Sequence, residues 1–164
     1  MPKLLAVYNT CGISGSVNVS NYITSLQSLL SQDFDGMHVA LSSCMNNPSD
    51  IQLLKNHFGD KISYNSIHDV VPISVTFNHT VQKCVEKFGK FDGYLFIDSG
   101  IDFVESQSSI FDLFKLFKSG PYGMVSARTN DDMGFDDWFK TDMQGDVLFE
   151  KGHLSVPLGM AVNL

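Results

Sequence analysis

An acidic residue follows directly on an apolar run in the stretch Gly-Tyr-Leu-Phe-Ile-Asp-Ser-Gly-Ile-Asp-Phe, residues 93–103. The run 94–97 leads into Asp98, and Asp102 comes four residues later. In open α/β sheets, ligands bind outside the carboxyl ends of the strands. A carboxylate at the end of such a strand brings negative charge to that place. We therefore predict that Asp98 contacts something bound.

The elements that must position Asp98 alternate between strand and helix. The continuous apolar run at 4–8 is typical of a strand covered on both faces, and further strands are expected at 37–41 and 94–97, with a short one at 61–67. Apolar stripes at helical spacing predict the helices between them. We expect these helices from 20 or 21 to 30, from 49 or 50 to 58, from 76–78 to 88 and from 108 or 109 to 117, with another strand at 122–127.

This alternation predicts an α/β fold, a three-layer sandwich with a mainly parallel central sheet and helices on both faces. The loops after Tyr8, Leu41 and Ile97 then meet at one edge of the sheet, where a ligand is expected. No internal repeat and no linker divides the chain, so residues 1–164 are expected to form a single domain.

Composition excludes several classes of protein. The chain has 164 residues, 43% of them hydrophobic and 18% charged, as in a soluble globular protein, and no apolar run is long enough to span a bilayer. It begins without the long apolar core of a secretion signal, and its three cysteines lack close pairing, so we expect reduced thiols and a cytoplasmic protein. The net charge of −7 argues against nucleic acid as the main partner and leaves a local basic pocket for a phosphate open.

Four stretches carry a resemblance to a known family. They are 6–32 (AVYNTCGISGSVNVSNYITSLQSLLSQ), 38–50 (HVALSSCMNNPSD), 73–89 (ISVTFNHTVQKCVEKFG) and 91–103 (FDGYLFIDSGIDF). In their order and spacing they resemble the nucleotide-sugar glycosyltransferases of the GT-A fold, most closely the large inverting family of bacterial-type sugar transferases. The likeness covers about residues 4–104, and it is weaker beyond.

The resemblance implies a set of site residues. The last stretch is similar to the strand that carries the family's Asp-X-Asp metal motif, with Asp98 as its first acid and Ser99 beside it in the nucleotide site. The stretch 73–89 resembles the family's segment in which an asparagine opens a helix, and this likeness implies that Asn78 lies near the ribose and diphosphate. The remaining nucleotide-binding residues implied are Tyr8 and Asn9, beside the base and ribose, and Ser42 and Ser43, where the family usually has an acid that contacts the base.

The chemistry of sugar transfer calls for these residue types. A nucleoside diphosphate leaves with extra negative charge, and a divalent cation bridging its phosphates stabilises that charge. Mn²⁺ or Mg²⁺ prefers carboxylate and phosphate oxygens, so few protein acids are needed. The family's second motif acid falls at Gly100. Asp102 lies about 13 Å from Asp98 in an extended strand, so it can share the metal only if Ser99 and Gly100 turn the chain back; otherwise Asp102 is a turn residue.

The second part of the chain is expected to supply part of the acceptor side. The resemblance assigns about 1–104 to nucleotide-sugar binding and 105–164 to the acceptor. An acceptor hydroxyl must lose a proton to a base, and the acidic patch at 131–137 is the place expected for it, with Asp137 beside Trp138 as the predicted catalytic base. The alternative is a solvated acidic loop, and His153 is an alternative metal ligand. Because the chain stops in the apolar run 159–164, we expect it to be cut inside a domain.

Three functions remain open from the sequence. The first is a glycosyltransferase of the hexosyltransferase type that uses a UDP- or GDP-sugar and an unknown acceptor. The second is a catalytically inactive GT-A remnant that acts as an interaction module, which Gly100 and the missing base-reading acid favour. The third, an NAD-type binder, is disfavoured because the glycine loop 12–16 lacks the G-x-G-x-x-G fingerprint. Structural roles also remain open: packing for Tyr8, a helix cap for Asn78, and a homo-oligomer contact for the phenylalanine-rich helix at 110–117.

Overall fold

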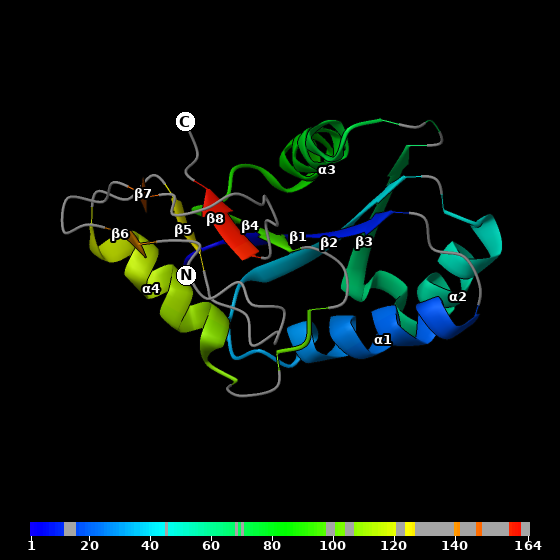
Figure 1. The fold of residues 1–164 in the computed structure, drawn as a ribbon, viewed down its shortest axis with the longest axis horizontal. Helices are drawn as coiled ribbons and strands as arrows, with labels where there is room; N and C mark the ends of the chain where they lie inside the picture. The colour runs from blue at the N-terminus through cyan, green and yellow to red at the C-terminus, as the bar shows by residue number, and fades with distance from the viewer. Residues whose placement is uncertain are drawn as a thin grey trace.

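A computed structural model describes residues 1–11, 16–44, 46–67, 69, 71–97, 101–103, 107–120, 124–126, 140–141, 147–148 and 158–161. The chain forms three layers, with a central sheet between helices (Figure 1). Helices α1, α2 and α4 cover one face of the sheet and α3 covers the other. The α/β class predicted from the sequence is confirmed.

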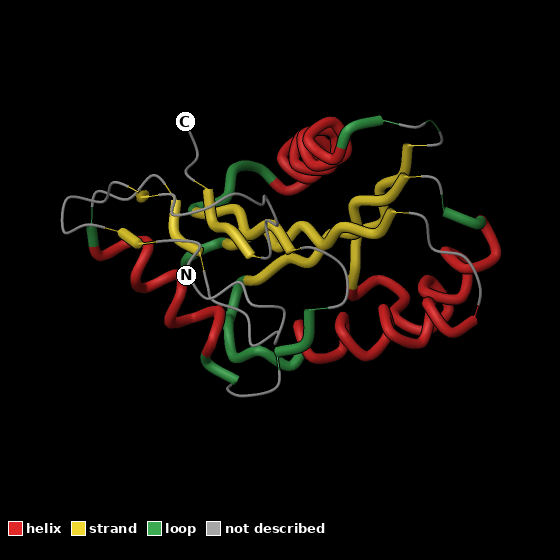
Figure 2. Tube along the Cα trace, viewed as in Figure 1, coloured by secondary structure: helices red, strands yellow, loops and turns green. Residues whose placement is uncertain are grey.

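The central sheet is mainly parallel. Its strand order is β3-β2-β1-β4-β8-β5, and β1 to β4 all run in the same direction. Strand β8 is antiparallel to both β4 and β5. The strands are β1 (Leu4–Cys11), β2 (Met37–Cys44), β3 (Ile62–Ile67), β4 (Gly93–Ile97), β5 (Met124–Ser126) and β8 (Leu158–Ala161), while β6 (Lys140–Thr141) and β7 (Val147–Leu148) form a separate pair (Figure 2).

The helices are α1 (Ser16–Leu30), α2 (Pro48–Phe58), α3 (Ile73–Phe88) and α4 (Ser109–Ser119), with a 3₁₀ turn η1 at Gly59–Lys61. Helix α3 begins earlier than the expected start at 76–78, directly after Pro72. The hydroxyl of Thr76 donates to the carbonyl of Ile73 at 2.8 Å, so Thr76 is satisfied within the helix and does not cap it. Asn78 therefore lies in the second turn, and the prediction that it opens or caps the helix is wrong.

Strands β1 and β2 run three residues beyond their apolar runs. Asn9 pairs with Ser42, Thr10 with Ser43 and Cys11 with Cys44 in the parallel ladder. Because polar side chains follow the apolar runs, the apolar pattern of the sequence did not show that the strands continue. Each strand supplies hydrogen-bond partners for the other's backbone, and this pairing keeps both extended.

The core divides at the sheet because successive strand residues face opposite sides. Leu4, Ala6 and Tyr8 of β1 pack with α1, α2 and α4, whereas Leu5 and Val7 pack on the α3 side. Helix α4 buries Ile110, Leu113, Phe114 and Phe117 and leaves Phe111 and Leu116 exposed. None of the helices in the described part of the chain is long and apolar enough to cross a membrane.

Candidate functional site

The carboxyl ends of β1, β2 and β4 form one edge of the sheet, called the carboxyl edge below. Tyr8 is in register with Leu41 on one side and with Ile97 on the other. Strand β4 ends at this level, while β1 and β2 continue for three more residues. Asp98 is the next residue in the sequence after Ile97, but Asp98, Ser99 and Gly100 lie outside the described residues.

Polar side chains are buried where β1 and β2 extend past β4. Thr10 and Ser42 are fully buried, and Asn9 and Ser43 are nearly so. Burying polar groups is unfavourable unless they find partners. Their concentration at the carboxyl edge distinguishes it from the apolar middle of the same strands, and this is the edge where α/β sheets bind ligands.

The loop after β2 is fixed against the end of β1. The side-chain amide of Asn46 donates to the carbonyl oxygen of Thr10 at 2.8 Å and to its hydroxyl at 3.2 Å. Next in the chain, the side chain of Asn47 accepts hydrogen bonds from the backbone N–H and the hydroxyl of Ser49, at 3.1 and 2.9 Å, and so caps α2. The loop after β2, which belongs to the stretch 38–50 that resembles the family, therefore has two polar anchors.

Tyr8 has no exposed surface. Its hydroxyl donates to the hydroxyl of Ser25 in α1 at 2.8 Å, and its ring meets that of Tyr22 edge-on, with centroids 6.2 Å apart. This placement matches the packing alternative for Tyr8, because a fully buried ring offers no face to a base. Its backbone lies beside Ile97, the last residue of β4, where the carboxyl edge begins.

Ser42 and Ser43 lie inside β2 and are buried, so the prediction that they stand in a polar loop is wrong. Pairing with Asn9 and Thr10 of β1 holds them in the sheet. The hydroxyl oxygen of Ser42 has no hydrogen-bond partner among the residues that the structure describes. Such a group carries a desolvation penalty of about 1–3 kcal/mol, and functional sites are among the places where this is tolerated.

The segment 101–103 lies along α1. The carbonyl of Ile101 accepts a hydrogen bond from the hydroxyl of Ser25, and the backbone N–H of Phe103 donates to the hydroxyl of Ser28 at 2.9 Å. Helix α1 returns from the carboxyl end of β1 toward the start of β2 (Figure 1). Ser28, three residues after Ser25, therefore lies nearly one turn farther from the carboxyl edge. Asp102 is exposed between these two contacts. Its sharing of a metal with Asp98 stays a prediction.

The other predicted residues are scattered or outside the described chain. Asn78 is exposed on α3, on the face of the sheet opposite α1. The acidic patch at 131–137, with the predicted base Asp137, and also Trp138 and His153, lie outside the described residues. Within the described part of the chain, no group of three or more histidine, cysteine, aspartate or glutamate side chains is arranged to hold a metal.

Sequence reasoning missed a cavity of about 760 Å³ that lies along β3. Three of the residues that line this cavity have shifted pKa values. Burial lowers the pKa of His38, and the charge of Lys87 lowers it further. Burial also raises the pKa of Tyr64 and of Cys84. The only sequence signal for the cavity is the set of lysines at 55, 83 and 87, which lie too far apart in the chain to be read as a cluster.

Comparison with known proteins finds likeness in structure and not in sequence. No family model matches the chain, and no curated protein sequence matches it. Among solved structures, a mannosyltransferase from Pyrobaculum calidifontis, in complex with GDP-Man and Mn²⁺, superposes with a TM-score of 0.65 at 9% identity, over 98% of this chain.

The chain has the GT-A-like fold of nucleotide-diphospho-sugar transferases.

Two further structures support this assignment of the GT-A-like fold. A protein from Desulfovibrio desulfuricans, assigned as a nucleotide-diphospho-sugar transferase, gives a TM-score of 0.56 at 10% identity over 99% of this chain. The 4-diphosphocytidyl-2C-methyl-D-erythritol synthase from Anaerococcus prevotii gives 0.52 at 10% identity over 98% of this chain. The chain spans 44% of the mannosyltransferase, 64% of the second structure and 71% of the third. At these identities the likeness establishes the fold alone.

Proposed function

We propose that the chain binds a nucleoside-diphosphate sugar, a UDP- or GDP-sugar, at the carboxyl edge and takes part in sugar transfer. The observation that carries the proposal is the superposition of 98% of the chain on a mannosyltransferase bound to GDP-Man and Mn²⁺. The buried polar ends of β1 and β2 support it, because they lie where this class of sheet binds ligands. The resemblance of 91–103 to a metal-motif strand points to the same edge.

The donor set at the carboxyl edge is compatible with a divalent cation held mainly by its substrate. Thr10, Ser42 and Ser43 bring neutral hydroxyl oxygens. The carboxylate would come from Asp98, next in the chain after the last residue of β4. Mg²⁺ and similar ions are often bound by one or two carboxylates together with substrate phosphates. The cation, when bound, would stabilise the charge that develops on the leaving diphosphate.

The roles of the remaining predicted residues follow from this proposal. Asn9, and the backbone at Tyr8, would border the base and ribose, and Asn46 would hold the neighbouring loop in place through Thr10. Asp137 remains the proposed base for the acceptor hydroxyl. We also propose that residues 105–164 supply part of the acceptor side.

A second candidate is a catalytically inactive GT-A domain that binds without turnover. Ser42 and Ser43 favour it, because they are uncharged and buried where the family usually has an acid that contacts the base. Asp102 also favours it, because its neighbours on both sides are bonded to α1. Binding of the nucleotide alone does not separate the two candidates, but turnover does.

Ligand-dependent stabilisation tests the proposed binding. We expect a GDP- or UDP-sugar with Mn²⁺, at about 100 times its Kd, to raise the melting temperature by roughly 5–10 °C. Asp98→Asn should abolish the part of the shift that depends on Mn²⁺. Asp35→Asn, an exposed residue in the turn before β2, is the matched control and should keep the full shift. No shift with any nucleotide sugar contradicts the proposal.

Turnover then separates the transferase from the inactive domain. Release of UDP or GDP from the stabilising sugar nucleotide, lost in Asp98→Asn and kept in Asp35→Asn, supports the transferase. Stabilisation by that donor, without release of nucleotide in the presence of candidate acceptors, supports the inactive domain.

A further inference from the structure

The cavity along β3 opens onto the outer edge of the sheet. Strand β3 stands at the end of the strand order in the described sheet. Four consecutive residues, from Ile62 to Asn65, line the cavity. Successive residues of a strand face opposite sides of a sheet, so a cavity in contact with all four follows the edge of the strand, where its backbone is accessible.

Contacts of β3 with the two flanking helices confirm this geometry. The hydroxyl of Tyr64 donates to the carbonyl of Leu54 in α2 at 3.1 Å. The side-chain amide of Asn65 lies 4.0 Å from the sulfur of Cys84 in α3. The two side chains thus point to opposite faces of the sheet. The cavity therefore forms a slot along the strand edge. Helices α2 and α3 lie on opposite faces of the sheet (Figure 1).

The slot is positively charged in a chain that is negative overall. Lys55 of α2 and Lys83 and Lys87 of α3 line it, and Asp60 is the one acid among the lining residues that the structure describes. The whole chain carries −7. The ammonium of Lys55 lies 5.6 Å from the ring centroid of Tyr64, which draws this charge toward β3. Three lysines from two helices therefore converge on an edge strand that carries no charge itself.

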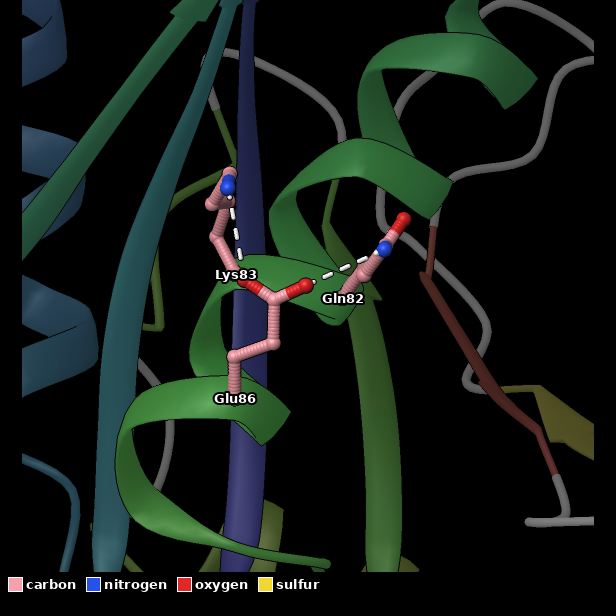
Figure 3. A network of polar contacts seen from close by, with 3 residues as sticks. All are labelled: Gln82, Lys83 and Glu86. Carbon is pink, nitrogen blue, oxygen red and sulfur yellow. Dashed lines mark hydrogen bonds and ion pairs between the residues drawn. The ribbon is translucent and has the colours of Figure 1, made fainter.

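Lys83 has a partner that it can exchange. Its ammonium lies 3.3 Å from a carboxylate oxygen of Glu86, one turn along α3, and Gln82 donates to the other oxygen at 3.1 Å (Figure 3). The hydrogen bond from Lys83 is the main reason that the pKa of Glu86 is lowered. Both side chains of the ion pair are about half exposed. Exposed pairs of this kind contribute little to stability, so a ligand carboxylate can compete for Lys83.

We propose that the outer edge of β3 binds an extended, acidic segment of another protein, which adds to the sheet as a further strand. An edge strand leaves the N–H and C=O groups of alternate residues unpaired, and an added strand pairs them. Acidic side chains of the added strand would meet the lysines of α2 and α3. Strand β3, Ile-Ser-Tyr-Asn-Ser-Ile, contains no proline or charge to block the pairing.

The same charges disfavour a second copy of this chain as the occupant. Pairing β3 of one copy with β3 of another would bring two sets of three lysines together, and facing like charges are destabilising. An acidic strand turns this repulsion into attraction. This site lies on the edge strand and not at the carboxyl ends of β1, β2 and β4, so it does not depend on the proposed sugar transfer.

A designed peptide tests the proposal. The probe is a labelled peptide of about eight residues, in which glutamate alternates with valine, and binding to the 164-residue chain is followed by fluorescence anisotropy. We expect binding that weakens as salt rises and slower hydrogen exchange of β3 amides in the complex. Lys83→Gln/Lys87→Gln should weaken binding roughly five- to tenfold. The matched double variant Lys115→Gln/Lys118→Gln, on α4, should bind as the unaltered chain does.

Two further peptides separate strand pairing from charge attraction. A peptide with lysine in place of glutamate should not bind. One with proline in place of two adjacent central residues, a valine and the glutamate beside it, should bind much more weakly, because one of two neighbouring N–H groups points to β3 and proline cannot donate it. Equal binding of the proline peptide, no loss of affinity in Lys83→Gln/Lys87→Gln, or no binding of the glutamate peptide up to about 1 mM overturns the proposal. Protection of β3 amides that rises with protein concentration, without peptide, overturns it in favour of a second copy.

Discussion

The hydroxyl of Tyr8 in β1 donates a hydrogen bond to the hydroxyl of Ser25 in α1, 2.8 Å away, and Ser25 in turn donates to the carbonyl of Ile101. Three segments that are distant in the chain therefore meet at one serine. Ser25 is fully buried, and the bond from Tyr8 is buried as well. This relay connects the first strand of the sheet with the chain that follows β4, and it holds that chain against α1.

Replacing Ser25 should destabilise the fold. Ser25→Ala leaves the hydroxyl of Tyr8 and the carbonyl of Ile101 without this partner, and we expect a loss of about 1–3 kcal/mol in the free energy of unfolding. Tyr8→Phe removes only the donor to Ser25, which keeps its bond to Ile101, so a smaller loss of about 0.5–1.5 kcal/mol is expected. Urea denaturation measures both. Ser31→Ala, exposed at the end of α1, is the control, and a loss of stability no larger in Ser25→Ala than in Ser31→Ala would contradict the relay.

The buried hydroxyl of Ser42 should be replaceable without loss of stability. Its oxygen has no hydrogen-bond partner in the described part of the structure. Ser42→Ala removes the desolvation penalty of that oxygen, and we expect the free energy of unfolding to stay the same or to rise by up to about 1 kcal/mol. If the carboxyl edge binds a nucleotide sugar near Ser42, the same variant should weaken binding.

Ser63 is the matched comparison for Ser42, since it occupies the neighbouring strand and its hydroxyl has a partner. It lies 2.9 Å from a ring nitrogen of His38. Ser63→Ala should lower the free energy of unfolding by about 0.5–1.5 kcal/mol. Equal losses in Ser42→Ala and Ser63→Ala, measured by urea denaturation, would mean that the hydroxyl of Ser42 is satisfied in solution.

Stability should depend on pH through His38. Burial lowers the pKa of this imidazole from its ordinary value of 6.5, and the charge of Lys87 lowers it further. The ring is also packed on Phe88, with centroids 4.2 Å apart. The unfolded chain therefore takes up a proton at His38 before the folded chain does. This contribution to stability is fully present above about pH 6.5 and is lost as the pH falls from there through the lower folded-state pKa.

Urea denaturation at a series of pH values measures this effect. We expect the free energy of unfolding to fall more steeply below about pH 6.5 in the unaltered chain than in His38→Gln, which has no imidazole at this position. The ring signals of His38 in an NMR titration should give a midpoint below its ordinary value. The same pH dependence in both proteins, or an unshifted midpoint, would be inconsistent with a neutral, buried His38.

The sequence by itself determined the layers of the fold. Two kinds of local pattern predicted the elements: the strand patterns at 4–8, 37–41 and 94–97, and the apolar stripes of the helices between them. The spacing of apolar residues in each pattern favours the element that buries them on one face or on both. The placement of Asp98 directly after a buried strand was determined in the same way. The resemblance of four stretches to the GT-A glycosyltransferases implied the GT-A-like architecture, which the structural comparisons confirm.

Only the tertiary structure decided what surrounds these elements. Asn9 and Ser42 belong to strands because each finds its backbone partner on the other strand, and no local pattern encodes that pairing. Asp102 came to lie beside α1 because two serines of that helix bond to its neighbours. The lysines of α2 and α3 form one charged slot because the sheet places their helices on either side of β3. In each case the residues lie far apart in the sequence, and only the packing of the folded chain brings them close together.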